Sequence, residues 1–170
     1  MRVLITNDDG IQSPGIQELS RHIESAGYEV VVVAPDHDAS GTGTSLGRIS
    51  SEEPVNVSRH SIPGLRAEAY GISGSPALCV VTGYLEAFGP VPDIVVSGIN
   101  AGLNTGRSTL HSGTVGAALA AQNFGIHGIA VSLDGSNEWQ WETAAQITVE
   151  VLPSVATGPN RSAFNINVPG

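Results

Sequence analysis

Three uninterrupted apolar runs constrain the fold of this chain more than any other feature of its sequence. They are the apolar centres of EVVVVAP (29–35), PDIVVSG (92–98) and GIAVSL (128–133). Strands that are apolar at nearly every position, and not only at every second one, are typical of parallel sheets that helices cover on both faces. We therefore expect an α/β fold with three layers and a mainly parallel sheet.

Segments with helical spacing alternate with these strands. Residues 13–28 begin with Ser-Pro, place Ile16, Leu19 and Ile23 on one face, and stop at Gly27, as an amphipathic helix does. The same kind of pattern predicts three more helices, over 75–88, 114–125 and 137–156. The regular alternation supports parallel strands joined by helical crossovers.

Shorter segments complete the expected sheet. Residues 2–6 and 164–168 are predicted strands, and the alternating pieces 54–59 and 66–72 predict a small peripheral strand pair off the main sheet. We find no linker, repeat or low-complexity tract. Residues 1–170 are therefore predicted to form a single domain.

The usage of charged residues narrows the classes of partner. The chain has 7 basic residues against 16 acidic ones, a formal net charge of −9, which argues against a polynucleotide as the main partner. All seven basic residues are arginine. The lack of lysine excludes a Walker A lysine, a pyridoxal Schiff base and a kinase-type strand lysine. Any bound phosphate must instead meet arginine, backbone N–H groups, a helix N-terminus or a metal ion.

Cysteine and hydropathy exclude further classes of site. Cys79 is the only cysteine, so an internal disulfide, a Cys-rich zinc site and an iron–sulfur cluster are excluded. Its apolar surroundings predict a small core residue.

No apolar stretch approaches the length of a membrane span or of a signal-peptide core. We expect no membrane partner and a cytoplasmic location.

Polar residues follow the buried strands at the point where each strand ends. Asp8 and Asp9 follow the first strand, Ser40 lies in the loop after the second, and Asn100 and Asp134 follow two later ones. Ligands of open parallel sheets bind beyond the carboxyl ends of the strands, so we expect these groups to converge on one edge. Carboxylate, hydroxyl and amide oxygens suit Mg²⁺, Mn²⁺ or Ca²⁺ better than zinc.

The motif Asn7-Asp8-Asp9-Gly10 also has a purely structural interpretation. Asn-Asp-Asp-Gly is a good turn sequence, so the motif alone does not separate a tight turn from a metal site. A sharp turn at Gly10 would also aim both carboxylates at one cation, which would remove their mutual repulsion. The glycine-rich stretch 41–47 is one residue off the dinucleotide-binding fingerprint and lacks a helix directly after it, so we do not interpret it as one.

The segment HSGTVGAALAA (111–121) starts an apolar helix directly after a polar loop. Free N–H groups there, beside the hydroxyls of Ser112 and Thr114, would form an anion site that needs no lysine. Plain N-capping of the helix by Ser112 is the alternative. His111 immediately precedes this segment and is the best histidine candidate for protonating a leaving alcohol, with a packing or solvent-facing role as the alternative.

Six motifs together resemble the SurE survival-protein family. They occur in the family's order, span essentially the whole chain, and read LITNDDGIQSPGI, VVVAPDHDASGTGTSL, DIVVSGINAGLNTG, HSGTVGAA, GIAVSL and FNINVPG. The resemblance implies a Rossmann-like α/β sandwich. It also implies a metal-dependent phosphatase acting on nucleoside 5′- and 3′-monophosphates, with short polyphosphate as a further substrate of some members.

The resemblance also implies a set of site residues. The family's metal ligands map onto Asp8, Asp9, Ser40 and Asn100. Its phosphate-side residues map onto Asn104, Ser112, Gly113 and Thr114, with His111 adjacent. Both sets agree with the convergence expected at the strand ends.

Three features depart from the family pattern. The loop DHDASG (36–41) stands where relatives more often carry arginines, and Leu78 stands where the family usually has Asp. The sequence stops at NINVPG (165–170), where relatives continue into a segment that mediates oligomer contacts, so we expect that C-terminal oligomerisation extension to be absent. A homodimer or higher homo-oligomer is still the expected assembly.

The combined hypothesis is a phosphomonoesterase that uses one divalent ion, Mg²⁺ or Mn²⁺, with Ca²⁺ as a substitute in a crystal. Asp8, Asp9 and His111 are its expected catalytic residues, and a nucleoside monophosphate is its expected substrate. One alternative is a nucleotide-binding or sensor module without turnover, suggested by Leu78 and the short C-terminus. The other is a metal-dependent hydrolase of a different ester or amide on the same scaffold.

Overall fold

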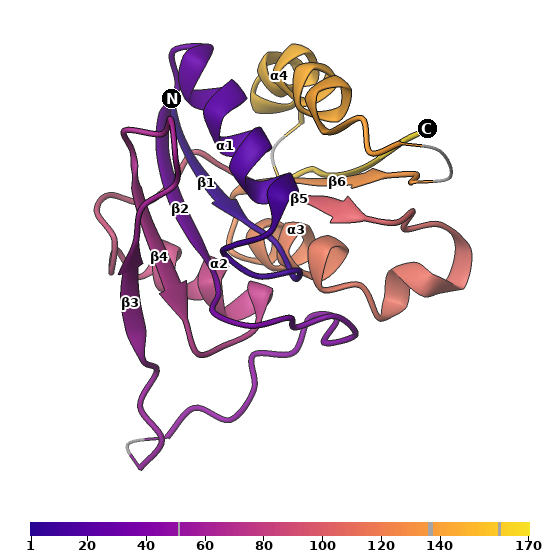
Figure 1. The fold of residues 1–170 in the computed structure, drawn as a ribbon. Helices are drawn as coiled ribbons and strands as arrows, with labels where there is room; N and C mark the ends of the chain where they lie inside the picture. The colour runs from indigo at the N-terminus through magenta and orange to yellow at the C-terminus, as the bar shows by residue number, and fades with distance from the viewer. Residues whose placement is uncertain (51, 136–137, 160) are drawn as a thin grey trace.

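The computed structural model describes residues 1–50, 52–135, 138–159 and 161–170, and its strands form one seven-stranded sheet (Figure 1). The sheet order is β3-β4-β2-β1-β5-β6-β7. The strands are β1 (Arg2–Thr6), β2 (Glu29–Pro35), β3 (Val57–His60), β4 (Glu68–Ile72), β5 (Ile94–Ala101), β6 (His127–Leu133) and β7 (Ala163–Val168). Neighbouring strands run parallel except β3 and β4, which are antiparallel.

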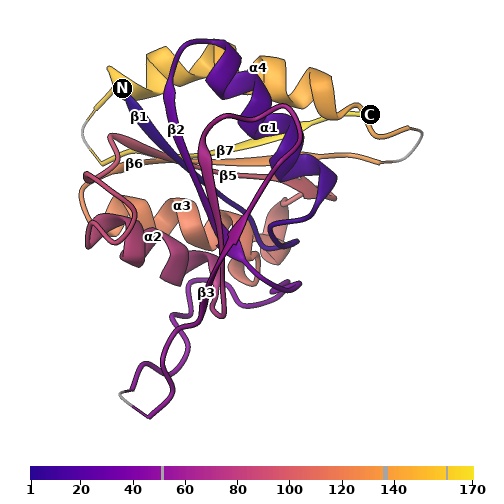
Figure 2. The same cartoon turned by 60° about the vertical axis from the view of Figure 1, so that its left-hand side comes forward.

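Helices cover both faces of the sheet. Helices α1 (Pro14–Ser25) and α4 (Trp141–Ala156) lie on one face, and α2 (Pro76–Tyr84) and α3 (Gly113–Asn123) lie on the other (Figure 2). A 3-10 helix, η1 (Gly106–Leu110), lies in the loop after β5. This is the three-layer α/β fold with a mainly parallel sheet, so that prediction is confirmed.

Strand β1 shows why the central strands are apolar at every position. Val3 and Ile5 pack in the core between the sheet and helices α1 and α4, whereas Leu4 packs in the core on the side of α2 and α3. Successive side chains of a strand point to opposite faces, so a sheet covered on both sides needs apolar residues throughout. Each such fully buried side chain contributes roughly 1.5–3 kcal/mol to folding.

Cys79 lies in the second of these cores and is fully buried, as predicted. Burial raises the pKa of its thiol to about 12, which keeps the sulfur uncharged at neutral pH. Within the part of the chain that the structure describes, no helix is both long enough and apolar enough to cross a bilayer.

The strand pair that we expected to lie off the main sheet, β3 and β4, forms one edge of that sheet. Strands β3 and β4 do pair with each other in antiparallel fashion. Strand β4 also pairs in parallel with β2, from Val31↔Glu68 to Pro35↔Ile72. The pair therefore extends the sheet beyond β2, whose edge would otherwise be unpaired.

The last helix is shorter at its start than the predicted 137–156. Residue 137 lies outside the described residues, and α4 begins at Trp141. The rings of Trp139 and Trp141 stack with centroids 4.9 Å apart, which side chains two positions apart on a helix do not do. The backbone at Gln140 is accordingly non-helical, with φ −87° and ψ 58°.

Candidate functional site

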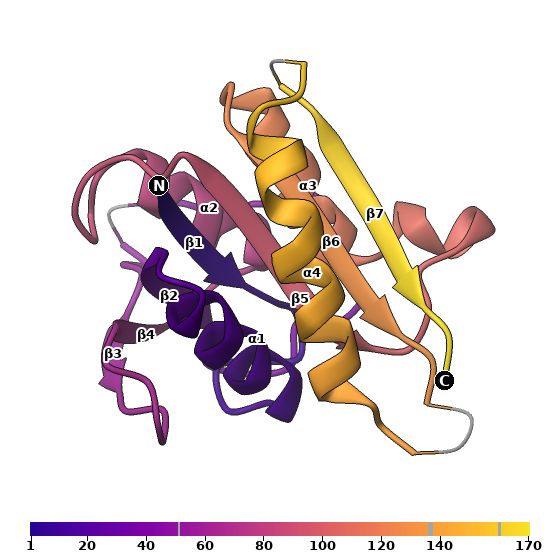
Figure 3. The same ribbon diagram turned by 90° about the horizontal axis from the view of Figure 1, so that it is seen from above.

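The carboxyl ends of β2, β1 and β5 bring the candidate residues together, with β1 between the other two strands. The arrows of β1, β6 and β7 point toward the same edge of the sheet (Figure 3). A pocket of about 260 Å³ at this edge, which we call the polar pocket, is lined by Asp8, Asp9, Ser40, Gly41, Asn100, Ala101, Asn104, Ser108, His111 and Ser112. Of the nine predicted site residues, only Gly113 and Thr114 do not line it. Asp134 does not line it either.

The turn after β1 is held by Asn7, which is fully buried. Its side-chain amide donates to the Gly10 carbonyl at 3.0 Å and to Ser13 Oγ at 2.7 Å, and its Oδ1 accepts from the Gly10 N–H at 3.1 Å. Gly10 has φ +94°, and a Cβ there would lie 3.0 Å from the His37 carbonyl oxygen. The motif is therefore a tight turn and also places Asp8 and Asp9 in the wall of the polar pocket.

Asp8 is bound to the first turn of α3. Its Oδ1 accepts from the Thr114 hydroxyl at 2.5 Å and its Oδ2 accepts from the Thr114 N–H at 3.1 Å. A Cβ at Gly113 would lie 2.8 Å from Asp8 Cβ, so the missing side chain gives Asp8 its room. The Thr114 N–H that we expected to be free for phosphate thus donates to Asp8. Thr114 therefore acts on the site by holding the Asp8 carboxylate in place.

Asp9 carries an electrostatic cost in the absence of a cation. Burial raises the pKa of this carboxyl to about 6, with further increases from the nearby charges of Asp8 and Asp38, while a hydrogen bond from the Ala101 backbone opposes the shift. A positive charge beside Asp9 would favour the ionised form and relieve this cost.

The other two predicted ligands also present oxygen atoms to the polar pocket. The Ser40 hydroxyl donates to Asp38 Oδ1 at 2.6 Å, which together with the Ser40 N–H lowers the pKa of Asp38. The side-chain amide nitrogen of Asn100 donates to the Gly102 carbonyl at 2.6 Å. Because the nitrogen is used there, the amide oxygen of Asn100 is its remaining ligand atom.

Asn100 follows an irregularity in β5. The pairing with β6 shifts between Ser97 and Asn100. Gly98 lies within the shift with φ +140°, and a Cβ there would lie 2.4 Å from the Val131 carbonyl oxygen. Only glycine fits such a close approach of two backbones. The irregularity thus determines where Asn100 meets the polar pocket.

Asn104 is held by the neighbouring strands. Its side-chain nitrogen donates to Ser132 Oγ at 2.9 Å, and its N–H donates to Asn167 Oδ1 at 2.8 Å. Its carbonyl accepts from the side-chain nitrogens of Asn165 at 2.9 Å and Asn167 at 3.2 Å. Sequence reasoning missed these two β7 asparagines, although two asparagines at alternate positions of a strand share one face and would have been a usable signal.

Ser112 and His111 lie at the start of α3. Ser112 Oγ accepts from the Val115 N–H at 3.1 Å, which is the N-cap alternative, and its O–H hydrogen is left to donate into the polar pocket that it lines. His111 is exposed and lines the same pocket. The positive end of the α3 dipole lies at this position, which favours an anion in the polar pocket.

The chemistry of these donors fits a hard divalent cation. Asp8, Asp9, Ser40 and Asn100 offer two carboxylates, a hydroxyl and an amide around one pocket, which is an oxygen set suited to Mg²⁺ or Mn²⁺. Within the described ranges, no three His, Cys, Asp or Glu side chains are grouped so as to hold a metal ion. A cation here would therefore depend on the neutral oxygens as well as on the carboxylate pair.

Leu78, which departs from the family pattern, lies away from this chemistry. Its side chain is 5% exposed and packs in the core beside α2 and α3. Its N–H donates to the N-cap Ser75 Oγ at 3.1 Å. Leu78 does not line the polar pocket, so this departure leaves the walls of the polar pocket intact.

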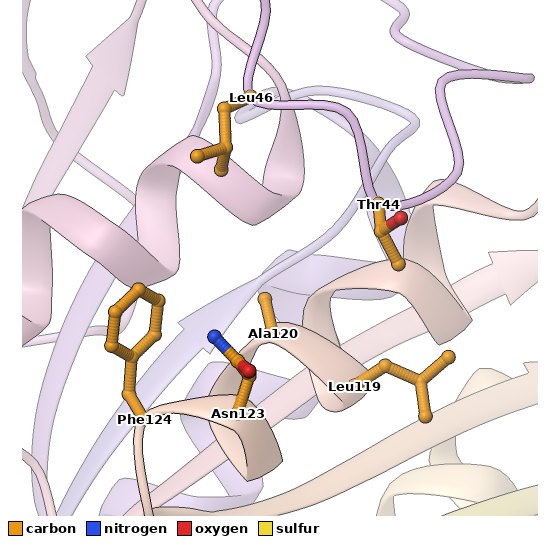
Figure 4. Close-up of a pocket in the computed structure, with 6 residues that line it drawn as sticks. All are labelled: Thr44, Leu46, Leu119, Ala120, Asn123 and Phe124. Carbon is orange, nitrogen blue, oxygen red and sulfur yellow. The ribbon is translucent and has the colours of Figure 1, made fainter.

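A larger pocket, of about 340 Å³, lies between the loop after β2 and the second half of α3 (Figure 4). It is lined by Thr44, Leu46, Leu119, Ala120, Asn123 and Phe124. None of these side chains is ionisable and none lines the polar pocket. This larger pocket therefore offers no acid, base or charged ligand for hydrolysis.

Comparison with known proteins agrees with this architecture. The family model described as "Survival protein SurE" matches residues 3–170. The chain is 41% identical over 169 residues to a protein named 5′-nucleotidase SurE from Desulfitobacterium hafniense, covering 99% of this chain and 64% of that protein. It is also 41% identical over 171 residues to a 5′/3′-nucleotidase SurE from Erwinia tasmaniensis, with the same coverage of each.

A solved structure gives the same result. The crystal structure of the SurE protein from Aquifex aeolicus superposes with a TM-score of 0.82 at 37% identity, over 99% of this chain and 66% of that one. The chain thus spans about two thirds of the length of the relatives that it matches. The matches cover nearly every residue of the chain and include both the fold and its sequence motifs, and the chain belongs to the SurE family.

Proposed function

We propose that this protein is a divalent-cation-dependent phosphomonoesterase that hydrolyses nucleoside 5′- and 3′-monophosphates. The observation that carries the proposal is one pocket lined by two carboxylates, neutral oxygen ligands, a helix start and a histidine. Relatives at about 41% identity bear the names 5′-nucleotidase and 5′/3′-nucleotidase. Their names supply the substrate class, which the polar pocket alone does not specify.

Four residues would hold the cation, namely Asp8, Asp9, Ser40 and Asn100. A bound divalent ion supplies Lewis-acid polarisation of the phosphoryl group and lowers the pKa of a coordinated water. Thr114 and Gly113 act on Asp8 and position it: Thr114 through its two hydrogen bonds and Gly113 by leaving space. This replaces our expectation that Thr114 itself meets the phosphate.

Asn104 and Ser112 would bind the non-bridging phosphate oxygens. The O–H of Ser112 is available as a donor because its oxygen, not its hydrogen, caps the helix. Asn104 is immobilised by Ser132, Asn165 and Asn167, so little rotational freedom is lost when substrate binds. Donors fixed before the reaction stabilise the charge that develops on the phosphoryl oxygens.

Asp9 and His111 are the groups left for proton transfer. Both oxygens of Asp8 accept from Thr114, whereas Asp9 is the carboxylate through which the attacking water would be oriented and deprotonated. Water forms a bond to phosphorus and the ester P–O bond breaks. His111 then gives its proton to the leaving alkoxide, so that a nucleoside and inorganic phosphate are released.

Phosphate release from a panel of nucleoside monophosphates, with Mg²⁺ or Mn²⁺ and then with excess chelator, tests this function. We expect turnover that depends on the added cation. A folded protein that binds nucleotide but releases no phosphate would instead support the non-hydrolytic binding module. Release that is insensitive to chelator would contradict the role given to the cation.

A further inference from the structure

A second pocket adjoins the polar pocket. It has a volume of about 270 Å³ and lies between the start of α1 and the segment that leads into α4. Asp9 and Ala101 line both pockets, while Trp139 and Trp141 line only the second. We call it the tryptophan pocket. The two pockets are therefore neighbours that share Asp9 and Ala101 as part of their walls.

The two indoles that line the tryptophan pocket are held in a defined arrangement. Trp139 and Trp141 stack with ring centroids 4.9 Å apart and an angle of 10° between the rings. A Cβ at Gly15 would lie 3.0 Å from the Trp141 ring, and one at Gly135 would lie 2.3 Å from the Trp139 ring. Both glycines therefore let backbone approach the indoles closely. The stacked ring pair thus lies directly against backbone at both glycines.

Trp139 is nevertheless 45% exposed. The chain has only two tryptophans and 5% aromatic residues, and one of the two indoles is exposed next to the polar pocket. Exposing this much aromatic surface costs free energy in water. A flat aromatic ligand would cover that surface and gain stacking and dispersion energy from it.

The ligand must also fit the chemistry next to the tryptophan pocket. A nucleoside monophosphate joins a charged phosphate to a neutral planar base through one ribose. Its phosphate fits the polar pocket, and its base fits the neighbouring tryptophan pocket. Because the base is uncharged, the net charge of −9 of the protein does not repel it. A phosphomonoester without a base leaves the tryptophan pocket empty.

We propose that the tryptophan pocket binds the nucleobase of the substrate and that Trp139 is a specificity-determining residue. This inference rests on the proposed phosphomonoesterase function and extends it. It makes the enzyme selective for phosphomonoesters that carry an aromatic base. Glycerol phosphate and inorganic polyphosphate are then poorer substrates than AMP.

The first test needs no turnover. Both tryptophans of the chain line this pocket, so intrinsic fluorescence excited at the red edge of the indole band reports on it directly. We expect adenosine, which carries no phosphate, to change the emission in a saturable way, and Trp139→Ala to weaken that binding about tenfold as seen by Trp141. A linear response to adenosine, or unchanged affinity in Trp139→Ala, would overturn the proposal.

The second test is kinetic. We expect kcat/KM for AMP to exceed that for glycerol 2-phosphate, and Trp139→Ala to reduce the ratio of the two about tenfold. Trp139→Phe should restore most of the ratio because it keeps an aromatic ring. Phe164→Ala, which removes an aromatic that is 41% exposed near the amino end of β7, is the matched control and should leave the ratio unchanged.

The outcomes separate the two proposals. An equal loss for both substrates in Trp139→Ala would mean a structural role for the indole and would overturn the inference. If neither substrate is hydrolysed, the phosphomonoesterase function fails, and the adenosine titration alone still decides whether the tryptophan pocket binds a base.

Discussion

Asp8, which lines the polar pocket, and Thr114, which is 106 residues away in the sequence, are joined by two buried hydrogen bonds. Asp8 lies within the turn after β1, and Thr114 lies in the first turn of α3. Each Asp8 oxygen accepts one hydrogen bond from Thr114. The pair therefore fixes the orientation of a proposed metal ligand and joins the turn after β1 to the start of α3.

We predict that Thr114→Val lowers both stability and activity. Valine keeps the shape and the N–H of Thr114 but leaves Asp8 Oδ1 without its partner, a buried loss of about 1–3 kcal/mol. Loss of a group that orients a metal ligand typically costs about 10- to 100-fold in metal affinity or activity. Thermal unfolding and cation-dependent phosphate release measure the two effects.

Thr148→Val is the matched control for this change. Thr148 is also fully buried, and its hydroxyl donates to the Ala144 carbonyl at 2.7 Å within α4. It should show no comparable fall in the cation affinity of the active enzyme. Equal effects of both variants on cation affinity would contradict the positioning role of Thr114.

The raised pKa of Asp9 predicts that, without divalent ions, the stability of the protein falls as the pH rises from about 4 to about 6. Its pKa is raised in the folded protein, from 3.8 to about 6, so between these values the folded state binds more protons than the unfolded state. Stability contributed by this group therefore falls as the pH rises through that window. Across this window the free energy of unfolding falls by about 1 kcal/mol once solvent screening is taken into account. This corresponds to a fall of roughly 3 °C in Tm.

Asp9→Asn removes the titrating group. With chelator present, we expect this variant to gain Tm relative to the original protein as the pH rises from about 4 to about 7. Asp38→Asn should differ from the original protein in another window: the hydrogen bonds from Ser40 lower the pKa of Asp38 below its ordinary 3.8, so this variant should lose Tm relative to the original protein as the pH rises toward about 4 and show no further change above it. Parallel pH curves for all three proteins would show that neither shift contributes to stability.

Asn167→Ala is predicted to impair substrate binding through Asn104, whose backbone Asn167 holds by two hydrogen bonds. Asn167 accepts from the Asn104 N–H at 2.8 Å and donates to its carbonyl at 3.2 Å. The variant removes these two hydrogen bonds and leaves Asn104 held by Ser132 and Asn165. We expect kcat/KM for a nucleoside monophosphate to fall about tenfold, the equivalent of roughly 1.4 kcal/mol. A variant with reduced Tm but unchanged kcat/KM would restrict Asn167 to a structural role.

Gly98→Ala tests the irregularity in β5. A Cβ there overlaps the Val131 carbonyl oxygen at 2.4 Å in a left-handed backbone region, so we expect a loss of about 3 kcal/mol in unfolding free energy. Gly27 also has a positive φ, of +90°, but no atom lies within 4 Å of the added carbon, so Gly27→Ala should lose only about 1 kcal/mol. Similar losses in the two variants would show that the contact with Val131 is unimportant.

The layers of the fold were predictable because local patterns specify them. The apolar runs at β2, β5 and β6 signal strands buried on both faces, and Ser-Pro starts signal α1 and α2. The place of β3 and β4 was not predictable in the same way. An alternating strand pair has the same sequence pattern whether or not one of its edges joins a larger sheet, and only β4's long-range pairing with β2 decides it.

The predictable part of the candidate site is the set of residues that end strands. Asp8, Asp9 and Asn100 could be placed because parallel strands deliver their ends to one edge. The use of the Thr114 N–H by Asp8, and the clamp on Asn104 from β7, could not be placed. Both depend on the distance between segments that are remote in sequence, and no local pattern reports that distance.

We expect the polar pocket to hydrolyse phosphomonoesters only with a divalent cation. Phosphate release from AMP by the original protein and by Asp9→Asn, each with Mn²⁺ and with excess chelator, tests it most directly. We predict release only by the original protein with Mn²⁺, while Asp9→Asn stays folded and gains thermal stability at about pH 7 in chelator. Comparable release by a folded Asp9→Asn variant, or by the original protein in chelator, would contradict the claim.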